Sequence, residues 1–159
     1  MLHFIRRNFK QAMREVKETL YFLHVRTILD YACVVWDPYQ DHLINRLEKL
    51  QNQAVRFVCN NYSPYSSVSE MKATLGWDLL HMRRQKLSLK LLHRIYYSQT
   101  GINRYNYLLE PDYISTRCDN DKKISAYNCR TNTFYYSFFP KSIRQWNSLP
   151  NDIVNVSNN

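Results

Sequence analysis

Glycine is scarce in this chain, which has only two glycines, Gly76 and Gly101, among its 159 residues. Glycine adopts the left-handed conformations of tight turns most readily, so a chain with so few of them favours long helices over a sheet of many strands. The same scarcity excludes a glycine-rich phosphate loop, because GxGxxG and GxxxxGK both need several glycines. We therefore expect a mainly α-helical fold.

Apolar residues recur at spacings of three and four through most of the first hundred residues, which is the period of a helix with a buried face. The first of these segments carries apolar residues on several faces, so that helix should be buried on most sides. The pattern predicts a bundle of about four helices, which run approximately from Met13 to Trp36, Asp41 to Cys59, Ser67 to Gly76 and Asp78 to Tyr97.

Local signals indicate where these helices begin and end. Pro38 should stop the first helix, because proline restricts the preceding residue and has no amide hydrogen. Ser67 and Glu70 have the spacing of a capping box, in which the serine oxygen accepts from the third helical N–H. Gly76 suits a left-handed C-cap, and Asp78 is expected to cap the helix that follows.

After residue 100 the sequence becomes polar, irregular and rich in tyrosine. We expect a helical domain of residues 1–100 and a linker-like aromatic segment of residues 101–159 that packs back on it. Residues 124–130 and 134–139 are expected to be extended, because of their threonines and aromatic residues. Pro140 should open a short terminal helix that reaches Trp146.

The chain carries 22 basic and 13 acidic residues, a formal net charge of +9. This balance favours polyanionic partners, with nucleic acid first and an anionic membrane surface second, although it also suits simple solubility. No apolar run reaches 18 residues, and the N-terminus lacks the apolar stretch of a secretory signal. We therefore expect an intracellular protein without a membrane partner, and the choice between nucleus and cytoplasm stays open.

The four cysteines contain no CxxC pair, so a zinc ribbon or knuckle is not expected. Cys33 and Cys59 fall in apolar helical patterns and should be small buried residues. Cys118 and Cys129 flank a polar stretch and could approach each other across a turn. We expect no metal site and no cofactor.

Motifs of catalysis are also missing from the sequence. The five histidines lack the HExxH spacing, and we expect His24 and His93 to be structural. Two-metal polymerase chemistry needs neighbouring carboxylates, and the nearest aspartate pair, Asp119 and Asp121, lies in a polar loop where both should be solvated. No catalytic residue and no enzymatic activity are expected.

Two groups of basic residues could contact phosphates. The first follows one face of a predicted helix without an intervening acidic residue, although an ordinary solvated face would look similar. The second is a less specific patch near the N-terminus. The first group consists of Arg83, Lys86, Lys90 and Arg94, and the second of Arg6, Arg7, Lys10, Arg14 and Lys17.

A cluster of aromatic residues near the C-terminus could stack on the bases of single-stranded nucleic acid. The alternative is that these rings pack against the helices, which aromatic side chains do more often, and we favour it. The cluster consists of Tyr135, Tyr136, Phe138, Phe139 and Trp146.

Four blocks, in this order, resemble the region that follows the reverse transcriptase domain in polyproteins of non-LTR (LINE-type) retrotransposons of the jockey-like and RTE-like groups. The opening FIRRNF also resembles the start of that region. The blocks are LDYACVVWDPY (Leu29 to Tyr39), LEKLQNQAVRFV (Leu47 to Val58), LGWDLLHMRRQKLSLKLLHRI (Leu75 to Ile95) and YYSFFPKSIRQWNSLPNDIV (Tyr135 to Val154).

The resemblance implies a helical thumb and linker from an RNA-directed DNA polymerase, with a thumb-like domain in residues 1–100. The aromatic-Ala-Asp-Asp turn of the family's polymerase is missing from this sequence, as is the endonuclease. The chain would then be a truncated, non-catalytic fragment that binds a template-primer duplex of RNA or DNA weakly, and its other partner would be the missing upstream palm and fingers.

Two alternatives remain at this point. The chain could be a helical protein-interaction module whose apolar faces, above all around Tyr31 to Trp36, dock a palm or a host partner. That alternative predicts a large exposed apolar patch. The chain could also be a mobile-element remnant without a function.

Overall fold

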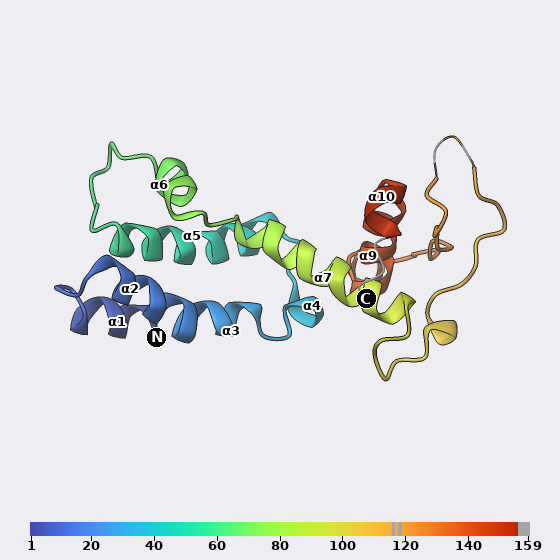
Figure 1. Cartoon of the computed structure of the whole chain (residues 1–159), viewed down its shortest axis with the longest axis horizontal. Coiled ribbons are helices and arrows are strands. Elements are labelled where there is room, and N and C mark those ends of the chain that lie inside the picture. The colour runs from blue at the N-terminus through green and yellow to red at the C-terminus, as the bar shows by residue number, and fades with distance from the viewer. Residues whose placement is uncertain (116, 118, 156–159) are drawn as a thin grey trace. The chain divides into compact units, whose positions relative to one another are not determined.

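The computed structural model describes residues 1–115, 117 and 119–155, and helices dominate it (Figure 1). The mainly α-helical fold predicted from the scarcity of glycine is therefore confirmed. No strand occurs in the described ranges, so the expected small extended segment near the C-terminus is not found. None of the described helices combines the length and apolar character needed to cross a bilayer.

The chain forms two compact units, Met1–Arg84 and Gln85–Asn159. The boundary between these units lies within a helix. The first unit contains α1 (Leu2–Asn8), α2 (Arg14–Tyr21), the π-helical η1 (Phe22–Arg26), α3 (Thr27–Asp30), α4 (Cys33–Trp36), α5 (Asp41–Val58), α6 (Val68–Leu75) and the first turn of α7 (Leu80–Tyr96).

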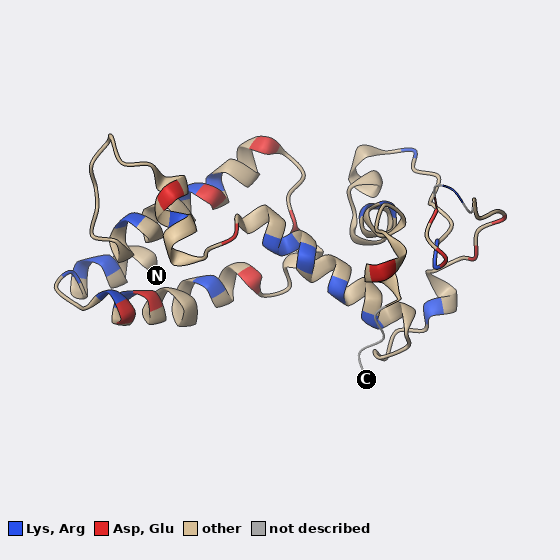
Figure 2. Cartoon of the chain, turned by 45° about the horizontal axis from the view of Figure 1, so that its top comes forward, with Lys and Arg blue, Asp and Glu red and all other residues tan. Residues whose placement is uncertain are grey.

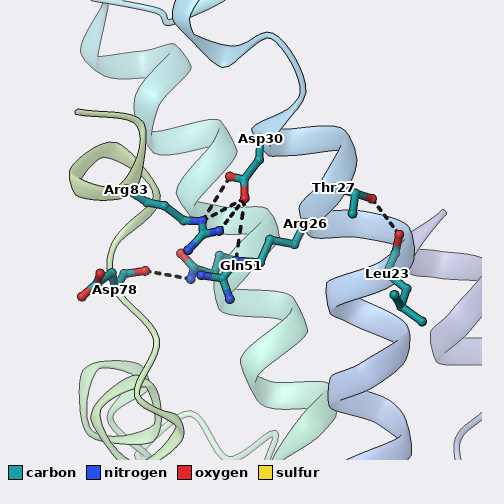
Figure 3. Close-up of polar contacts among 7 residues, drawn as sticks. All are labelled: Leu23, Arg26, Thr27, Asp30, Gln51, Asp78 and Arg83. Carbon is teal, nitrogen blue, oxygen red and sulfur yellow. Dashed lines mark hydrogen bonds and ion pairs between the residues drawn. The ribbon is translucent and has the colours of Figure 1, made fainter. Parts of the chain in front are cut away.

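The helix predicted from Met13 to Trp36 is interrupted twice. Its middle is the π-helical η1, where the Thr27 hydroxyl donates to the Leu23 carbonyl at 2.6 Å (Figure 3). A hydroxyl that competes for this carbonyl perturbs the regular ladder. The second break follows Asp30, because Tyr31 is extended and Ala32 is left-handed with φ 48°.

The core of the first unit forms where α2 and η1 lie alongside α5 (Figure 1). Tyr21 stacks on Trp77 with ring centroids 4.4 Å apart, and burial raises the pKa of Tyr21 to about 12. On α5, the apolar residues Ala54 and Val58 are buried, and Leu43, Leu47 and Leu50 nearer its start are half-buried. The core residues are Leu2, Ile5, Tyr21, Val25, Ala54, Val55, Phe57, Val58, Met71 and Trp77.

The predicted helix ends of α6 are confirmed. The N–H of Glu70 donates to Ser67 Oγ at 3.3 Å, and Gly76 is left-handed with φ 65°. The first N–H of α7, that of Leu80, donates to the Glu48 carboxylate at 3.1 Å. Glu48 also pairs with the buried Lys72, so one carboxylate joins α5 to both following helices.

The second unit contains the rest of α7 and four short helices around a small core. Pro140 lies in the first turn of α9, as predicted. The short helices are η2 (Arg104–Asn106), α8 (Asn132–Tyr135), α9 (Phe138–Asn147) and α10 (Asn151–Val154), and the core consists of Leu92, Ile95, Leu108, Ile124, Ile143, Trp146 and Val154.

The segment expected to be extended, residues 134–139, is instead mostly helical. Thr131 caps α8 by accepting from the Phe134 N–H at 3.3 Å, and a helical turn forms there despite the aromatic residues. Residues 124–130 have no regular structure. The Asn147 side chain holds their start through two hydrogen bonds to the Ile124 backbone, at 3.0 and 2.8 Å.

Candidate nucleic-acid interface

The first candidate surface is an open basic pocket beside α1, with a volume of about 940 Å³. Leu2 and Ile5 are buried in the core of the first unit, so the other faces of this short helix point outward. The pocket is lined by His3, Phe4, Arg6, Arg7, Lys10 and Tyr62.

Tyr62 reaches this pocket from the loop between α5 and α6. The Arg6 guanidinium lies 5.8 Å from the centroid of its ring. Arg56 holds the loop by donating to the Ser63 carbonyl at 2.8 Å, and Ser66 Oγ donates to Asn61 Oδ1 at 3.0 Å. The ring is therefore presented by a loop with its own hydrogen-bonded framework.

The chemistry of this pocket, which we call the N-terminal basic pocket, combines cations with open aromatic faces. Phe4 is 58% exposed and Tyr62 is 49% exposed, and none of the described lining residues is acidic. Guanidinium and ammonium groups can contact phosphates, and an exposed ring can stack on a base. The pocket therefore offers both kinds of contact that a single strand uses.

A smaller basic pocket of about 340 Å³ adjoins it and shares Lys10. Arg14 lines this second pocket and is exposed. Lys17 lines it too, but Lys17 is buried and its ammonium lies 5.1 Å from the centroid of the Phe57 ring. Of the five residues in the predicted N-terminal patch, Lys17 is therefore the one that belongs to the core.

The first residue of the predicted basic stripe on α7, Arg83, is engaged in an ion pair. The Arg83 guanidinium donates to both oxygens of Asp30, with distances of 2.7 to 3.2 Å (Figure 3). Arg26 lies 3.9 Å from the same carboxylate. Arg83 is half-buried and its guanidinium joins α7 to α3, so it serves the packing of the first unit.

The other three residues of the stripe, Lys86, Lys90 and Arg94, are exposed. The first and last lie eight positions apart, or about 12 Å along the helix. Figure 2 shows the blue positions of α7 with no red one among them, because α7 contains no acidic residue. Arg94 also lies 3.5 Å from the carbonyl oxygen of Gln99. These three cations form the second candidate surface.

Lys86 and Lys90 border an open groove of about 480 Å³ in the second unit. Leu89, Trp146, Leu149 and Ile153 make most of its lining apolar. Asp152 also lines it and counters part of the lysine charge. This groove is a weaker phosphate site than the N-terminal basic pocket.

The C-terminal aromatic cluster divides between core and surface. Trp146 is buried, and Phe138 and Phe139 are half-buried against the second core, as the packing interpretation predicts. Tyr135 and Tyr136 are exposed instead. The Arg144 guanidinium lies 3.5 Å from the centroid of Tyr135 and donates to its carbonyl oxygen at 2.7 Å, so one face of this ring is covered.

Of the remaining polar candidates, some have structural contacts and others are exposed. Asp119, expected to be solvated, accepts from the Lys123 ammonium at 2.6 Å, and this hydrogen bond lowers the pKa of the Asp119 carboxyl. Asp121 is exposed. His93 packs on Tyr97 with ring centroids 4.6 Å apart, whereas His24 is exposed.

The cysteines agree with the sequence only in part. Cys33 is buried and Cys59 is half-buried, and burial raises the pKa of both thiols. Cys129 has a free thiol that lies 3.5 Å from the Tyr127 carbonyl oxygen. Cys118 lies outside the described residues. Within those residues, no group of three or more His, Cys, Asp or Glu side chains is arranged to hold a metal ion.

Sequence reasoning missed Phe4 and Tyr62 as members of the N-terminal basic pocket. Phe4 adjoins the basic pair in sequence and could have been noticed there. Tyr62 lies 56 positions after Arg6, and no short motif connects the two.

No family model, curated protein or solved structure matches the chain.

Proposed function

We propose that this chain is a non-catalytic nucleic-acid-binding module, the thumb-and-linker part of an RNA-directed DNA polymerase of the non-LTR retrotransposon type. The polymerase assignment comes from the resemblance of the four sequence blocks. The nucleic-acid assignment is carried by one observation: the N-terminal basic pocket brings Arg6, Arg7 and Lys10 together with two exposed aromatic rings.

The module binds its ligand through two surfaces in this proposal. The N-terminal basic pocket contacts phosphates and stacks a base, and the exposed cations Lys86, Lys90 and Arg94 contact a second stretch of phosphates. Arg83 is not assigned a phosphate, because its guanidinium is bound to Asp30. The chain supplies binding alone, so a primer-extension assay with the purified protein should give no product.

Affinity for an oligonucleotide should fall steeply with added salt, because phosphate contacts release counterions. Replacing Arg6 and Arg7 by glutamine should reduce the slope of log K against log salt by about two for a duplex, and replacing Lys86 and Lys90 should have a similar effect. Fluorescence anisotropy between about 50 and 200 mM salt measures this.

The matched control is the pair Arg46→Gln and Lys49→Gln, which removes the same charge from exposed positions on α5 outside both surfaces. An equal reduction of the slope in this control would mean that the general field of the protein, not contact at the two surfaces, drives binding. Absence of a salt dependence in the unchanged protein would refute the nucleic-acid proposal itself.

Replacing Tyr62 by leucine should weaken binding of a single strand by about tenfold, since base stacking on an aromatic ring contributes about 1–3 kcal/mol. Replacing it by phenylalanine should change little, because the ring remains. A duplex, whose bases are already stacked, should bind both variants alike. Anisotropy titrations with a single strand and a duplex of equal length separate these outcomes, and equal losses for Tyr62→Phe and Tyr62→Leu would contradict the stacking role.

A further inference from the structure

A second kind of surface, unrelated to the basic pockets, lies on α4 and α5 of the first unit. It is an open groove of about 530 Å³. Three half-buried leucines of α5 form its floor, and the α4 end and the following proline form a wall. The groove is lined by Trp36, Pro38, Leu43, Arg46, Leu47, Lys49, Leu50 and Gln53.

The wall of this groove is held in place by a hydrogen bond of Trp36 and by the buried Arg84 behind it. The Trp36 indole N–H donates to the Tyr31 carbonyl oxygen at 2.7 Å, and the Arg84 guanidinium lies 5.9 Å from the Trp36 ring centroid. Arg84 is itself buried and donates to Asp37 at 2.6 Å. A preformed wall lowers the entropic cost of binding a partner.

Two apolar residues close in sequence to the groove wall are also exposed. Val35, on the same helical turn as Trp36, is 84% exposed, and Tyr31 is also exposed. Large exposed apolar side chains near an apolar groove are typical of an interaction site. The floor leucines follow one another at spacings of four and three, so they present a ridge along α5 that another helix can pack against.

The charges around the groove select the partner. Arg46 and Lys49 line it and are exposed, and the described lining residues include no carboxylate. The one glutamate of α5, Glu48, is bound to Lys72 and to the Leu80 N–H. A partner that buries apolar side chains here therefore meets the positive charges of Arg46 and Lys49 on the lining.

We propose that this groove docks an amphipathic helix of another protein, with leucine-like residues on its apolar face and acidic residues flanking them. Leu43 and Gln53, at the two ends of the lining on α5, lie ten positions or about 15 Å apart, which matches a partner helix of about ten residues. Its apolar side chains enter the groove at helical spacings, and its carboxylates pair with Arg46 and Lys49. This role goes beyond nucleic-acid binding and gives a location to the interaction-module alternative.

A second copy of this chain fits the groove less well, because each copy has a net charge of +9 and brings further positive charge to a basic edge. A nucleic acid would satisfy the two cations but would leave the leucine floor without a partner. An acidic amphipathic helix satisfies both features.

The test is a binding titration of the full chain with two synthetic helical peptides. Both carry leucines at spacings of three and four; one has glutamates beside them and the other has lysines. We expect the glutamate peptide to bind at least about tenfold more tightly than the lysine peptide. Arg46→Glu with Lys49→Glu should reverse this preference, and Leu47→Gln should weaken the glutamate peptide about tenfold.

Leu23→Gln is the matched control, since Leu23 is an exposed leucine outside the groove, and it should leave peptide affinity unchanged. Circular dichroism establishes that each variant keeps its helices. Equal affinity for the two peptides, no binding of either, or no effect of Leu47→Gln in a folded variant would overturn the proposal.

Two further outcomes would also overturn it. One is a dimer in sedimentation that Leu47→Gln abolishes, which would assign the groove to a second copy. The other concerns an oligonucleotide that still binds to the Arg6→Gln, Arg7→Gln variant. If this oligonucleotide displaced the bound peptide, the groove would be assigned to nucleic acid. Because Leu47→Gln should leave oligonucleotide affinity unchanged, failure of this proposal and failure of the nucleic-acid function remain distinguishable.

Discussion

Replacing Arg84 by alanine should lower the free energy of unfolding of the first unit by about 3–5 kcal/mol, because it removes the buried member of an ion pair with a half-buried carboxylate. Arg84 is 2% exposed, and its Nε donates to Asp37 Oδ1 at 2.6 Å. The same guanidinium lies beside the Trp36 ring. The substitution therefore removes an ion pair and part of the packing behind the apolar groove.

Urea unfolding followed by circular dichroism measures this loss. The informative control is the double variant Arg84→Met, Asp37→Asn, which removes both charges and keeps side chains of similar size. We expect it to recover most of the stability, since replacing both members of a buried pair is often nearly neutral. A single variant within about 1 kcal/mol of the original chain would show that Asp37 finds other compensation.

Replacing Trp146 by alanine should destabilise the second unit by about 3–5 kcal/mol, the cost of removing a large aromatic side chain from a core. Trp146 is 2% exposed and stacks on Tyr96 with ring centroids 5.4 Å apart. Its indole N–H donates to the Lys122 carbonyl oxygen at 2.8 Å, which ties α9 to the irregular segment before it. The small core has few other large side chains to close the cavity.

Hydrogen exchange at the amides of α9, together with urea unfolding, measures the effect. Trp146→Phe is the graded control: it keeps an aromatic ring for Tyr96 and loses the hydrogen bond, so its loss should be smaller. If the alanine and phenylalanine variants were equally stable, the packing of Trp146 would not support this unit.

The elements predicted best from the sequence depend on residues close together in the chain. The capping box of Ser67 and Glu70 and the left-handed Gly76 need only a few neighbouring positions, and Pro140 lies in the first turn of α9 for the same local reason. The bundle of about four helices was a coarser expectation. The break after Asp30 was missed because no proline or glycine marks it, and the Trp36 hydrogen bond to Tyr31 accompanies it.

The candidate site was predicted only as far as charge and helical spacing allow. The spacing of Arg83 and Lys86 places both on one side of α7, but spacing does not reveal Asp30, which lies 53 positions from Arg83 and binds it. Tyr62 joins Arg6 through the fold alone. Long-range partners of this kind decide which cations stay available, and a single sequence carries no signal for them.

Lys10 lines both basic pockets at the N-terminus, so the two pockets have one ammonium group in common. A small free anion that occupies either pocket uses this charge for itself. Linked phosphates can share the ammonium and reach the guanidinium groups on both sides without a second loss of translational freedom. The shared lysine thus favours linked phosphates that reach both pockets over the same phosphates as separate anions.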